Sequence, residues 1–217
     1  MKPDLVIFDC DGVLVDSEPP FNAVVSDNLA RYGLTLSHAD VVEAFMGKAM
    51  PDLIARAREM GADNPAPDSE WIEEIYAEGY ARLRDGVDPI PGIFDVLDRL
   101  DAAGVPYCVG SNGSQVKMDI TLGSTGLAPR FEGARFSAHE LGVAKPDPEL
   151  FLIAAREMGH DPARTVVVED SATGALAAKR AGMRCFGYAA HDDGAKLAAQ
   201  GAHLFRDMAD LPALLGL

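Results

Sequence analysis

The sequence predicts an α/β fold in which a parallel sheet carries helices on both faces and one helical domain is inserted. Strand-like apolar runs recur along the chain, and helical patterns lie between the later ones. Such alternation indicates a parallel sheet covered on both sides. Residues 17 to 88 break the alternation, because they read as helices without a convincing strand. We therefore expect a core of residues 1–16 and 89–217 and a separate small domain at residues 17–88.

The core is predicted from four strand-like runs, which are LVIFD (5–9), YCVGS (107–111), RTVVVED (164–170) and RCFGY (184–188). Continuous apolar stretches such as TVVV agree with strands buried on both faces. Helical patterns near these strands stop at Gly104, Gly159 and Gly182, since glycine commonly follows the last turn of a helix. In KPDPEL we expect Asp147 to cap the next helix and Pro148 to take its first position.

The inserted segment reads as four helices, at residues 18–32, 38–46, 50–60 and 69–85. The first three are followed by a glycine, and the proline-rich stretch GADNPAPDSE links the last two. Four aromatic residues of the segment are expected to form its core, namely Phe45, Trp71, Tyr76 and Tyr80.

Composition and charge exclude several classes of protein. The 217 residues are 48% hydrophobic and no apolar run approaches the ~20 residues that span a bilayer. A formal net charge of −15 disfavours nucleic acid and anionic membranes as partners. The start MKPDLVIFD contains acids where a signal peptide would not, so we expect a cytoplasmic protein.

The three cysteines, Cys10, Cys108 and Cys185, lie in apolar strand-like runs. Their odd number and context do not suggest a secreted disulfide framework, and we expect buried, reduced thiols. No arginine lies six residues after any of them, which excludes a Cys-x5-Arg phosphatase loop.

Two carboxylates follow the first predicted strand, where DLVIFDCDG places Asp9 and Asp11 two residues apart. A buried strand does not normally accept acidic side chains unless other groups pair with them. Ligands of open α/β sheets bind at the carboxyl ends of the strands, and other polar groups are expected at that edge. These are Ser111, Asn112 and Gly113 in SNG, Lys145 in AKPDP, and Glu169 and Asp170 in VVVEDS.

This set of side chains suits phosphoryl transfer to a carboxylate. One carboxylate can act as the nucleophile, while a second, two residues on, moves protons to the leaving group and from water. Asp9 and Asp170 offer the hard oxygen ligands that Mg²⁺ prefers, and the ion would offset both the acids and a phosphate. Lys145 and the Ser111 hydroxyl can hold the transferring oxygens.

The arrangement resembles the haloacid dehalogenase (HAD) superfamily through four motifs in the family's order, which are DCDGVLVDS, SNG, KPDP and VVVEDS. The resemblance covers nearly the whole chain and implies a Rossmann-like core. The insertion resembles the four-helix cap of the branch that holds β-phosphoglucomutases and sugar-phosphate phosphatases. We expect the cap to close over the site during the reaction and to reopen for release, with hinges near 15–17 and 87–92.

The resemblance also implies roles for single residues. Asp9 is expected as nucleophile and magnesium ligand, and Asp11 as general acid/base whose backbone carbonyl ligates the metal. Asp170 is expected to ligate the magnesium ion through its carboxylate. Glu169 is expected to ligate the same ion, either directly or through water.

Substrate contacts are expected from the strand ends and from the cap. Ser111 and Lys145 bind phosphate with Asn112 assisting, and the predicted substrate site also includes Gly12, Gly47, Lys48 and Gly113. Lys48 is either a substrate contact or a solvated loop residue. Arg82 and Arg84 are further cap cations that could meet substrate carboxylates or hydroxyls.

The reaction is expected to be hydrolysis. The dehalogenase branch lacks the second aspartate, which is present here as Asp11. The family's hexose mutases carry a cap histidine and a cap arginine, where this chain has Pro20–Phe21 and Lys48 to Met50. We expect a phosphatase for a sugar or sugar-acid phosphate, as a monomer or weak homodimer. A β-phosphoglucomutase-type mutase and a non-catalytic binding homologue are the alternatives.

Overall fold

The computed structural model describes residues 2–37, 40, 41, 44, 50–190 and 192–217. Contacts within the chain divide it into two compact units. The core comprises residues 1–16 and 88–217, and the helical unit comprises residues 17–87. Over the described ranges, no helix is long and apolar enough to cross a membrane.

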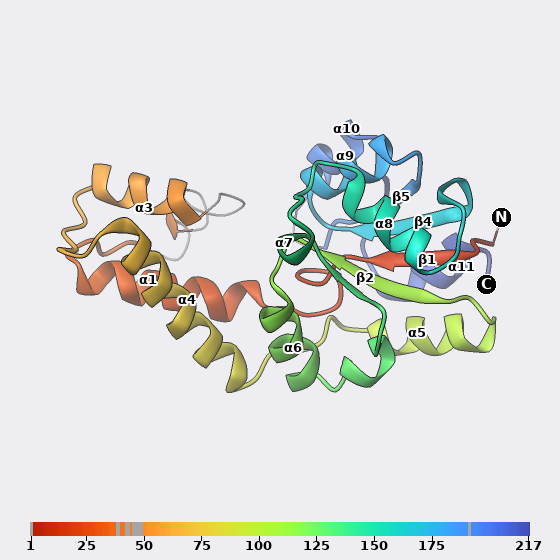
Figure 1. Ribbon diagram of the computed structural model, residues 1–217, viewed down its shortest axis with the longest axis horizontal. Coiled ribbons are helices and arrows are strands. Elements are labelled where there is room, and N and C mark those ends of the chain that lie inside the picture. Colours follow the sequence, from red (N-terminus) through yellow and green to blue (C-terminus); the bar gives the residue numbers. More distant parts are fainter. Residues whose placement is uncertain (1, 38–39, 42–43, 45–49, 191) are drawn as a thin grey trace. The chain divides into compact units, whose positions relative to one another are not determined.

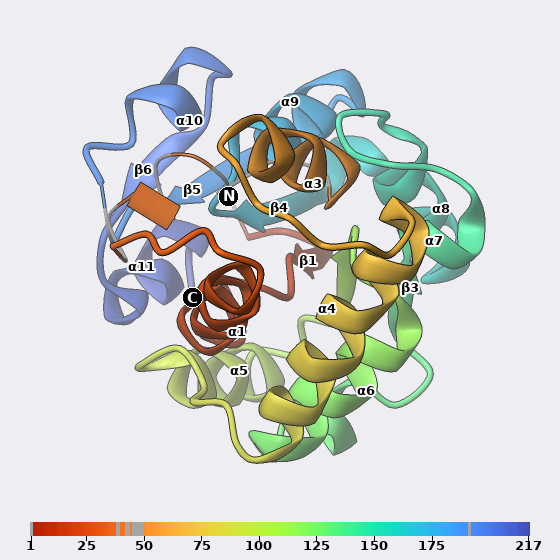
Figure 2. The ribbon, with the colours of Figure 1, turned by 90° about the vertical axis from the view of Figure 1, so that its left-hand side faces the viewer.

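The core is built on a six-stranded sheet in the order β3-β2-β1-β4-β5-β6, and every neighbouring pair is parallel. Figure 2 shows the sheet with β6 at the left and β3 at the right. The four predicted runs form the inner strands, which are β1 (Leu5–Phe8), β2 (Tyr107–Ser111), β4 (Thr165–Glu169) and β5 (Arg184–Tyr188). The outer strands β3 (Arg135–Ser137) and β6 (His203–Phe205) were not predicted, because three residues give too short an apolar pattern.

The strand register brings the predicted acids to one edge. All four residues of β1 are buried, and Phe8 pairs with Val109 of β2 and with Val168 of β4. The Asp9 amide continues the ladder by donating to the Val168 carbonyl at 2.9 Å. Asp9 and Glu169 therefore follow paired residues at the carboxyl ends of adjacent strands.

Helices cover both faces of the sheet, with α8 (Glu149–Glu157) and α9 (Ala172–Arg180) on one side and α5 (Ile93–Ala102) and α6 (Gln115–Ser124) on the other (Figure 1). Leu5 and Ile7 of β1 pack into one buried cluster with residues of α8 and α9. The shorter helical elements of the core are η1 (Ala128–Phe131), α7 (Ala138–Leu141), η2 (Pro162–Arg164), α10 (Ala195–Ala199), η3 (Met208–Asp210) and α11 (Leu211–Leu215).

The glycine signals for helix ends are confirmed. Gly104, Gly159 and Gly182 directly follow the C-cap residues of α5, α8 and α9, all with positive φ. At each, the amide of the glycine and the amide of the next residue donate back to carbonyls of the last turn, which the helix leaves without a partner. The predicted start of α8 was one residue early. Asp147 accepts from the amide of Glu149 at 2.9 Å, and Pro148 precedes the helix instead of opening it.

The helical unit contains α1 (Glu18–Arg31), α3 (Met50–Glu59) and α4 (Asp68–Arg84). The predicted helix at 38–46 lies mostly outside the described residues, as does Phe45. Trp71 is fully buried, and its indole donates to Asn28 Oδ1 at 2.6 Å. The expectation that Tyr76 and Tyr80 form part of the core of the unit was wrong: Tyr76 is 37% exposed, Tyr80 is half-buried, and neither belongs to the buried cluster. Tyr76 lies against Phe21 and Tyr80.

Candidate active site

A buried lysine joins two of the predicted acids. Lys145 Nζ donates to Asp9 Oδ1 at 2.7 Å and to Glu169 Oε1 at 2.6 Å. The Glu169 side chain is fully buried and that of Lys145 is 3% exposed, so this ammonium supplies the pairing that buried carboxylates require. It also lies 5.2 Å from the ring centre of Phe151 in α8, within range of a cation–π contact.

The second oxygen of Glu169 is held by the start of α9. Glu169 Oε2 accepts from the Ser171 amide at 2.9 Å and from the Ser171 hydroxyl at 2.7 Å. The same hydroxyl caps α9 by accepting from the Gly174 amide at 3.0 Å. The sequence VVVEDSATG thus fixes the carboxylate and the helix start together.

Burial and charge shift the ionisation of this group. Burial raises the pKa of the Asp9 carboxyl and repulsion from Glu169 and Asp11 adds to it, so the pKa reaches about 7 despite Lys145. Burial lowers the pKa of Lys145, but attraction to Asp9 and Glu169 outweighs this and the pKa lies above its ordinary value. Lys145 therefore stays charged at neutral pH.

Asp9, Glu169 and Asp170 each offer an oxygen that lies within 4.8 Å of the other two, close enough to share one cation. The backbone of Gly12 approaches this group closely: a Cβ there would lie 1.9 Å from Asp170 Oδ2, and its φ is +76°. Three carboxylates against one ammonium leave excess negative charge. A hard divalent ion such as Mg²⁺ fits this donor set and offsets that charge.

The SNG stretch forms a turn beside these acids. Ser111 is buried, and its hydroxyl accepts from the Gly113 amide at 3.0 Å. Asn112 Oδ1 accepts from the Lys145 amide at 2.9 Å, which joins the end of β2 to the KPDP segment. A Cβ at Gly113 would lie 3.2 Å from Ser111 Oγ and 3.7 Å from Asp11 Oδ2, so both side chains flank this glycine.

Lys117 is a site residue that the sequence reasoning missed. Its ammonium lies 2.9 Å from Asp11 Oδ1, and each side chain is 22% exposed. Burial lowers the pKa of Lys117, but attraction to Asp11 outweighs it and the pKa is raised. The signal available in the sequence was its position in the first turn of the helix after SNG, since that turn starts at the same edge of the sheet.

The described residues thus bring together Asp9, Lys145, Glu169 and Asp170, with Gly12 beside them, while Asp11, Ser111 and Gly113 form an adjoining group. Gly47 and Lys48 lie outside the described residues. Arg82, in the last turn of α4, donates to the Gly86 carbonyl at 3.3 Å.

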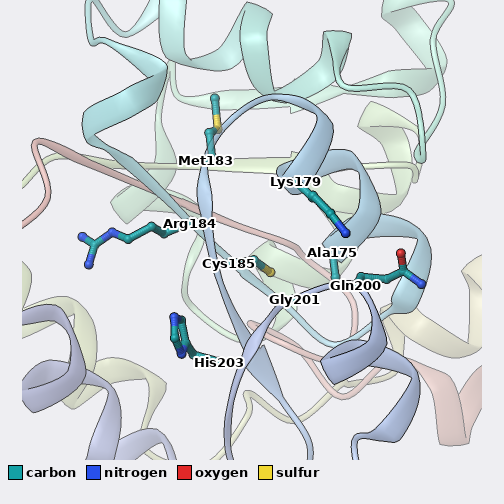
Figure 3. Close-up of a pocket in the computed structure, with 8 residues that line it drawn as sticks. All are labelled: Ala175, Lys179, Met183, Arg184, Cys185, Gln200, Gly201 and His203. Atoms are coloured by element: carbon teal, nitrogen blue, oxygen red, sulfur yellow. The ribbon is translucent and has the colours of Figure 1, made fainter.

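A hollow of about 250 Å³ lies at the amino ends of β5 and β6, whereas the acids lie at the carboxyl ends of the strands. Figure 3 shows the residues that line it, which are Ala175, Lys179, Met183, Arg184, Cys185, Gln200, Gly201 and His203. Burial raises the pKa of the Cys185 thiol to about 12, so this cysteine is not a nucleophile at neutral pH. All three cysteines are buried and unpaired, as predicted.

Comparison with known proteins agrees with this fold. Residues 3–182 match the family of haloacid dehalogenase-like hydrolases. The chain belongs to that family.

Relatives of known name lie near 30% identity. The chain is 30% identical over 213 residues to 6-phosphogluconate phosphatase from Escherichia coli K12, with 97% of this chain and 94% of that protein covered. It is 31% identical to Protein SUPPRESSOR OF QUENCHING 1, chloroplastic, from Arabidopsis thaliana, where 95% of this chain spans only 20% of the plant protein. A solved HAD family hydrolase from Deinococcus radiodurans R1, with bound phosphate and sodium, is 32% identical with a TM-score of 0.84, over 98% and 95% of the two chains.

Proposed function

We propose that the protein is a magnesium-dependent phosphatase that hydrolyses a small phosphorylated metabolite, a sugar or sugar-acid phosphate. The observation that carries this proposal is the buried group of Asp9, Lys145 and Glu169, with Asp170 close enough to share a cation. A fixed ammonium beside a carboxylate suits phosphoryl transfer, because the protein mainly has to position the reacting groups and stabilise charge.

In the proposed reaction a carboxylate oxygen of Asp9 attacks phosphorus, and the bond from phosphorus to the leaving oxygen breaks. Asp11 gives a proton to that oxygen, so the product departs as an alcohol and Asp9 carries the phosphoryl group. Water then attacks phosphorus and gives its proton to Asp11. The bond to Asp9 breaks, which releases phosphate and restores both side chains. Ser111, Lys145 and Asn112 are proposed to hold the phosphate.

Mg²⁺, when bound, would supply positive charge that offsets the carboxylates and the phosphate. Asp9, Asp170 and the backbone carbonyl of Asp11 are the proposed ligands. Both oxygens of Glu169 already accept hydrogen bonds, from Lys145 and Ser171, so for Glu169 we favour ligation through water.

The substrate class is supported by the relative named 6-phosphogluconate phosphatase, whose name denotes a sugar-acid phosphate. Lys48, Arg82 and Arg84 are proposed to select the substrate by meeting its carboxylate or hydroxyls. The cytoplasmic location and the monomeric or weakly dimeric state stay predictions.

A phosphomutase is the second candidate, because solved structures named β-phosphoglucomutase share the fold. Phe21 argues for hydrolysis, since an aromatic ring stands where the mutases are expected to carry a histidine. Within the helical unit this ring packs against Tyr76 and covers Gly79, where a Cβ would lie 2.3 Å from it. The ring has a packing role there and offers no proton.

The test is phosphate release with Mg²⁺ from a panel of sugar and sugar-acid monophosphates, comparing the wild type with Asp9→Asn. Asp95→Asn, at an exposed position of α5, is the matched control. We expect magnesium-dependent release that Asp9→Asn abolishes and Asp95→Asn retains. The panel includes β-glucose 1-phosphate. Its conversion to glucose 6-phosphate without net phosphate release would support the phosphomutase and contradict the phosphatase.

A further inference from the structure

We infer that Lys117 is a positioning residue: it holds Oδ1 of the Asp11 carboxyl group, so that Oδ2 carries the proton that goes to the leaving group. The inference rests on the proposed function, because it assigns Lys117 a part in the reaction in which Asp11 moves protons. Lys117 lies outside the four motifs that identify the family in this chain.

The Lys117 backbone is fixed from both sides. Ser114 caps α6, and its hydroxyl accepts from the Lys117 amide at 3.2 Å. One turn later the Thr121 hydroxyl donates to the Lys117 carbonyl at 3.1 Å. The Lys117 side chain therefore extends from a rigid first turn of α6, and its ammonium lies 2.9 Å from Asp11 Oδ1.

The Asp11 backbone is fixed as well. Asp11 forms an isolated parallel bridge with Val15, and the Gly12 amide donates to the Val15 carbonyl at 2.9 Å. What the backbone leaves open is rotation of the Asp11 side chain. The ion pair with Lys117 limits that rotation, because it ties one oxygen to the start of α6.

The ion pair directs Asp11 toward the phosphate-binding stretch. A Cβ placed on Gly113 would lie 3.7 Å from Asp11 Oδ2, 3.2 Å from Ser111 Oγ and 3.6 Å from Lys117 Cδ. The three side chains thus meet around one glycine. Each of the two side chains is 22% exposed, so the ion pair is partly shielded from water. The attraction between its charges is therefore stronger than in an ordinary surface pair.

Proton transfer requires the acid within hydrogen-bond reach of the leaving oxygen. Loss of Lys117 removes one restraint on the Asp11 side chain, so the acid spends less time within that reach and the step in which the leaving group needs a proton should slow. A leaving group that departs as a stable anion needs that proton much less. A purely structural link between α6 and the loop after β1 would affect both kinds of substrate alike.

The experiment measures kcat/KM, which covers the steps up to loss of the leaving group, for Lys117→Met, Lys117→Arg and the wild type. The substrates are p-nitrophenyl phosphate and the best sugar phosphate of the panel described above. We expect Lys117→Met to lose roughly tenfold or more on the sugar phosphate, as a part of the roughly 10²–10⁴-fold that general acid catalysis contributes, and much less on p-nitrophenyl phosphate. Lys117→Arg should restore most of the loss, and Lys179→Met, at an exposed position of α9, should match the wild type.

Equal losses on the two substrates, or none on either, overturn the positioning role while leaving the phosphatase proposal intact. A wild type that is silent on the whole panel overturns the proposed function and this role with it. If methionine at this position unfolds the protein, Lys117→Gln is the second neutral variant and must show the same difference between the two substrates.

Discussion

At the scale of single residues, two glycines leave room for the acids of the site because they have no side chain. A Cβ at Gly174 would lie 1.8 Å from Glu169 Oε1, and one at Gly12 would lie 1.9 Å from Asp170 Oδ2. Neither approach is physically possible for a real side chain, so any larger residue must displace a carboxylate. These two glycines are part of the site although they carry no chemistry.

We predict that Gly174→Ala destabilises the protein by about 1–3 kcal/mol, as expected for overpacking of a buried position, and lowers phosphatase activity. The added methyl group must push Glu169 away from Lys145 and Ser171. Urea denaturation and phosphate release would measure the two effects.

Gly123→Ala is the matched control, because Gly123 is also helical but a Cβ there meets nothing within 4 Å. It should retain activity and gain roughly 0.5–1 kcal/mol, since alanine favours helices over glycine. Equal stability and activity of the two variants would show that Glu169 is not held where the structure has it.

At the scale of elements, a buried amide joins α1 to α4. Asn28 is fully buried, accepts from the Trp71 indole at 2.6 Å, and donates to Glu74 and Glu78 at 3.2 Å each. Arg31, one turn further along α1, also pairs with Glu74 and Glu78. The contact between the two helices therefore combines an apolar core with a network of satisfied polar groups.

We predict that Asn28→Ala destabilises the helical unit by about 1–3 kcal/mol, because it leaves the buried indole N–H of Trp71 without its acceptor. Trp71 is the single tryptophan of the chain, so its fluorescence during urea denaturation reports on this unit. Asp27→Ala, at an exposed position of the same helix, should change stability by less than about 0.5 kcal/mol. Superimposable transitions for the two variants would contradict the prediction.

The same scale shows what the sequence could and could not predict. Inner strands and glycine-ended helices were predictable, because long apolar runs and positive-φ glycines leave strong local signals. The three-residue edge strands β3 and β6 were not, since their position depends on pairing with β2 and β5. Strand-end acids were predictable because parallel strands end at one edge. For Lys117 the sequence offered only its position in the first turn after SNG, because its contact with Asp11 depends on where that turn of α6 directs the side chain.

At the scale of the whole molecule, both the chain and its candidate site carry more acidic than basic groups. A formal net charge of −15 accompanies three clustered carboxylates, of which two, Asp9 and Glu169, pair with the buried ammonium of Lys145. A cation bound by all three acids relieves their repulsion only in the folded protein, because unfolding separates Asp9 from Glu169 and Asp170. Cation binding is therefore linked to stability.

We predict that Mg²⁺ raises the unfolding temperature of the wild type by several degrees relative to EDTA. Binding at a hundred times Kd stabilises by about 2.7 kcal/mol, and about 1 kcal/mol shifts Tm by roughly 2–4 °C at this chain length. Asp170→Asn should lose most of the shift, whereas Asp95→Asn should keep it. Differential scanning calorimetry at constant ionic strength would measure this, and a full shift in Asp170→Asn would contradict a cation site at Asp170.

The strand order also has a consequence during protein synthesis. β1 is made first, yet it lies between β2 and β4, so its two hydrogen-bonding neighbours are complete only once synthesis has passed residues 111 and 169. At about 5–20 residues per second, the apolar stretch LVIF waits several seconds or longer with both edges open. Asp9 likewise cannot pair with Lys145, or lie beside Glu169, until those residues have been synthesised. A chain halted before β4 would carry an unfinished sheet and only some of the candidate site residues, and we expect such nascent chains to be the form of this protein most in need of a chaperone.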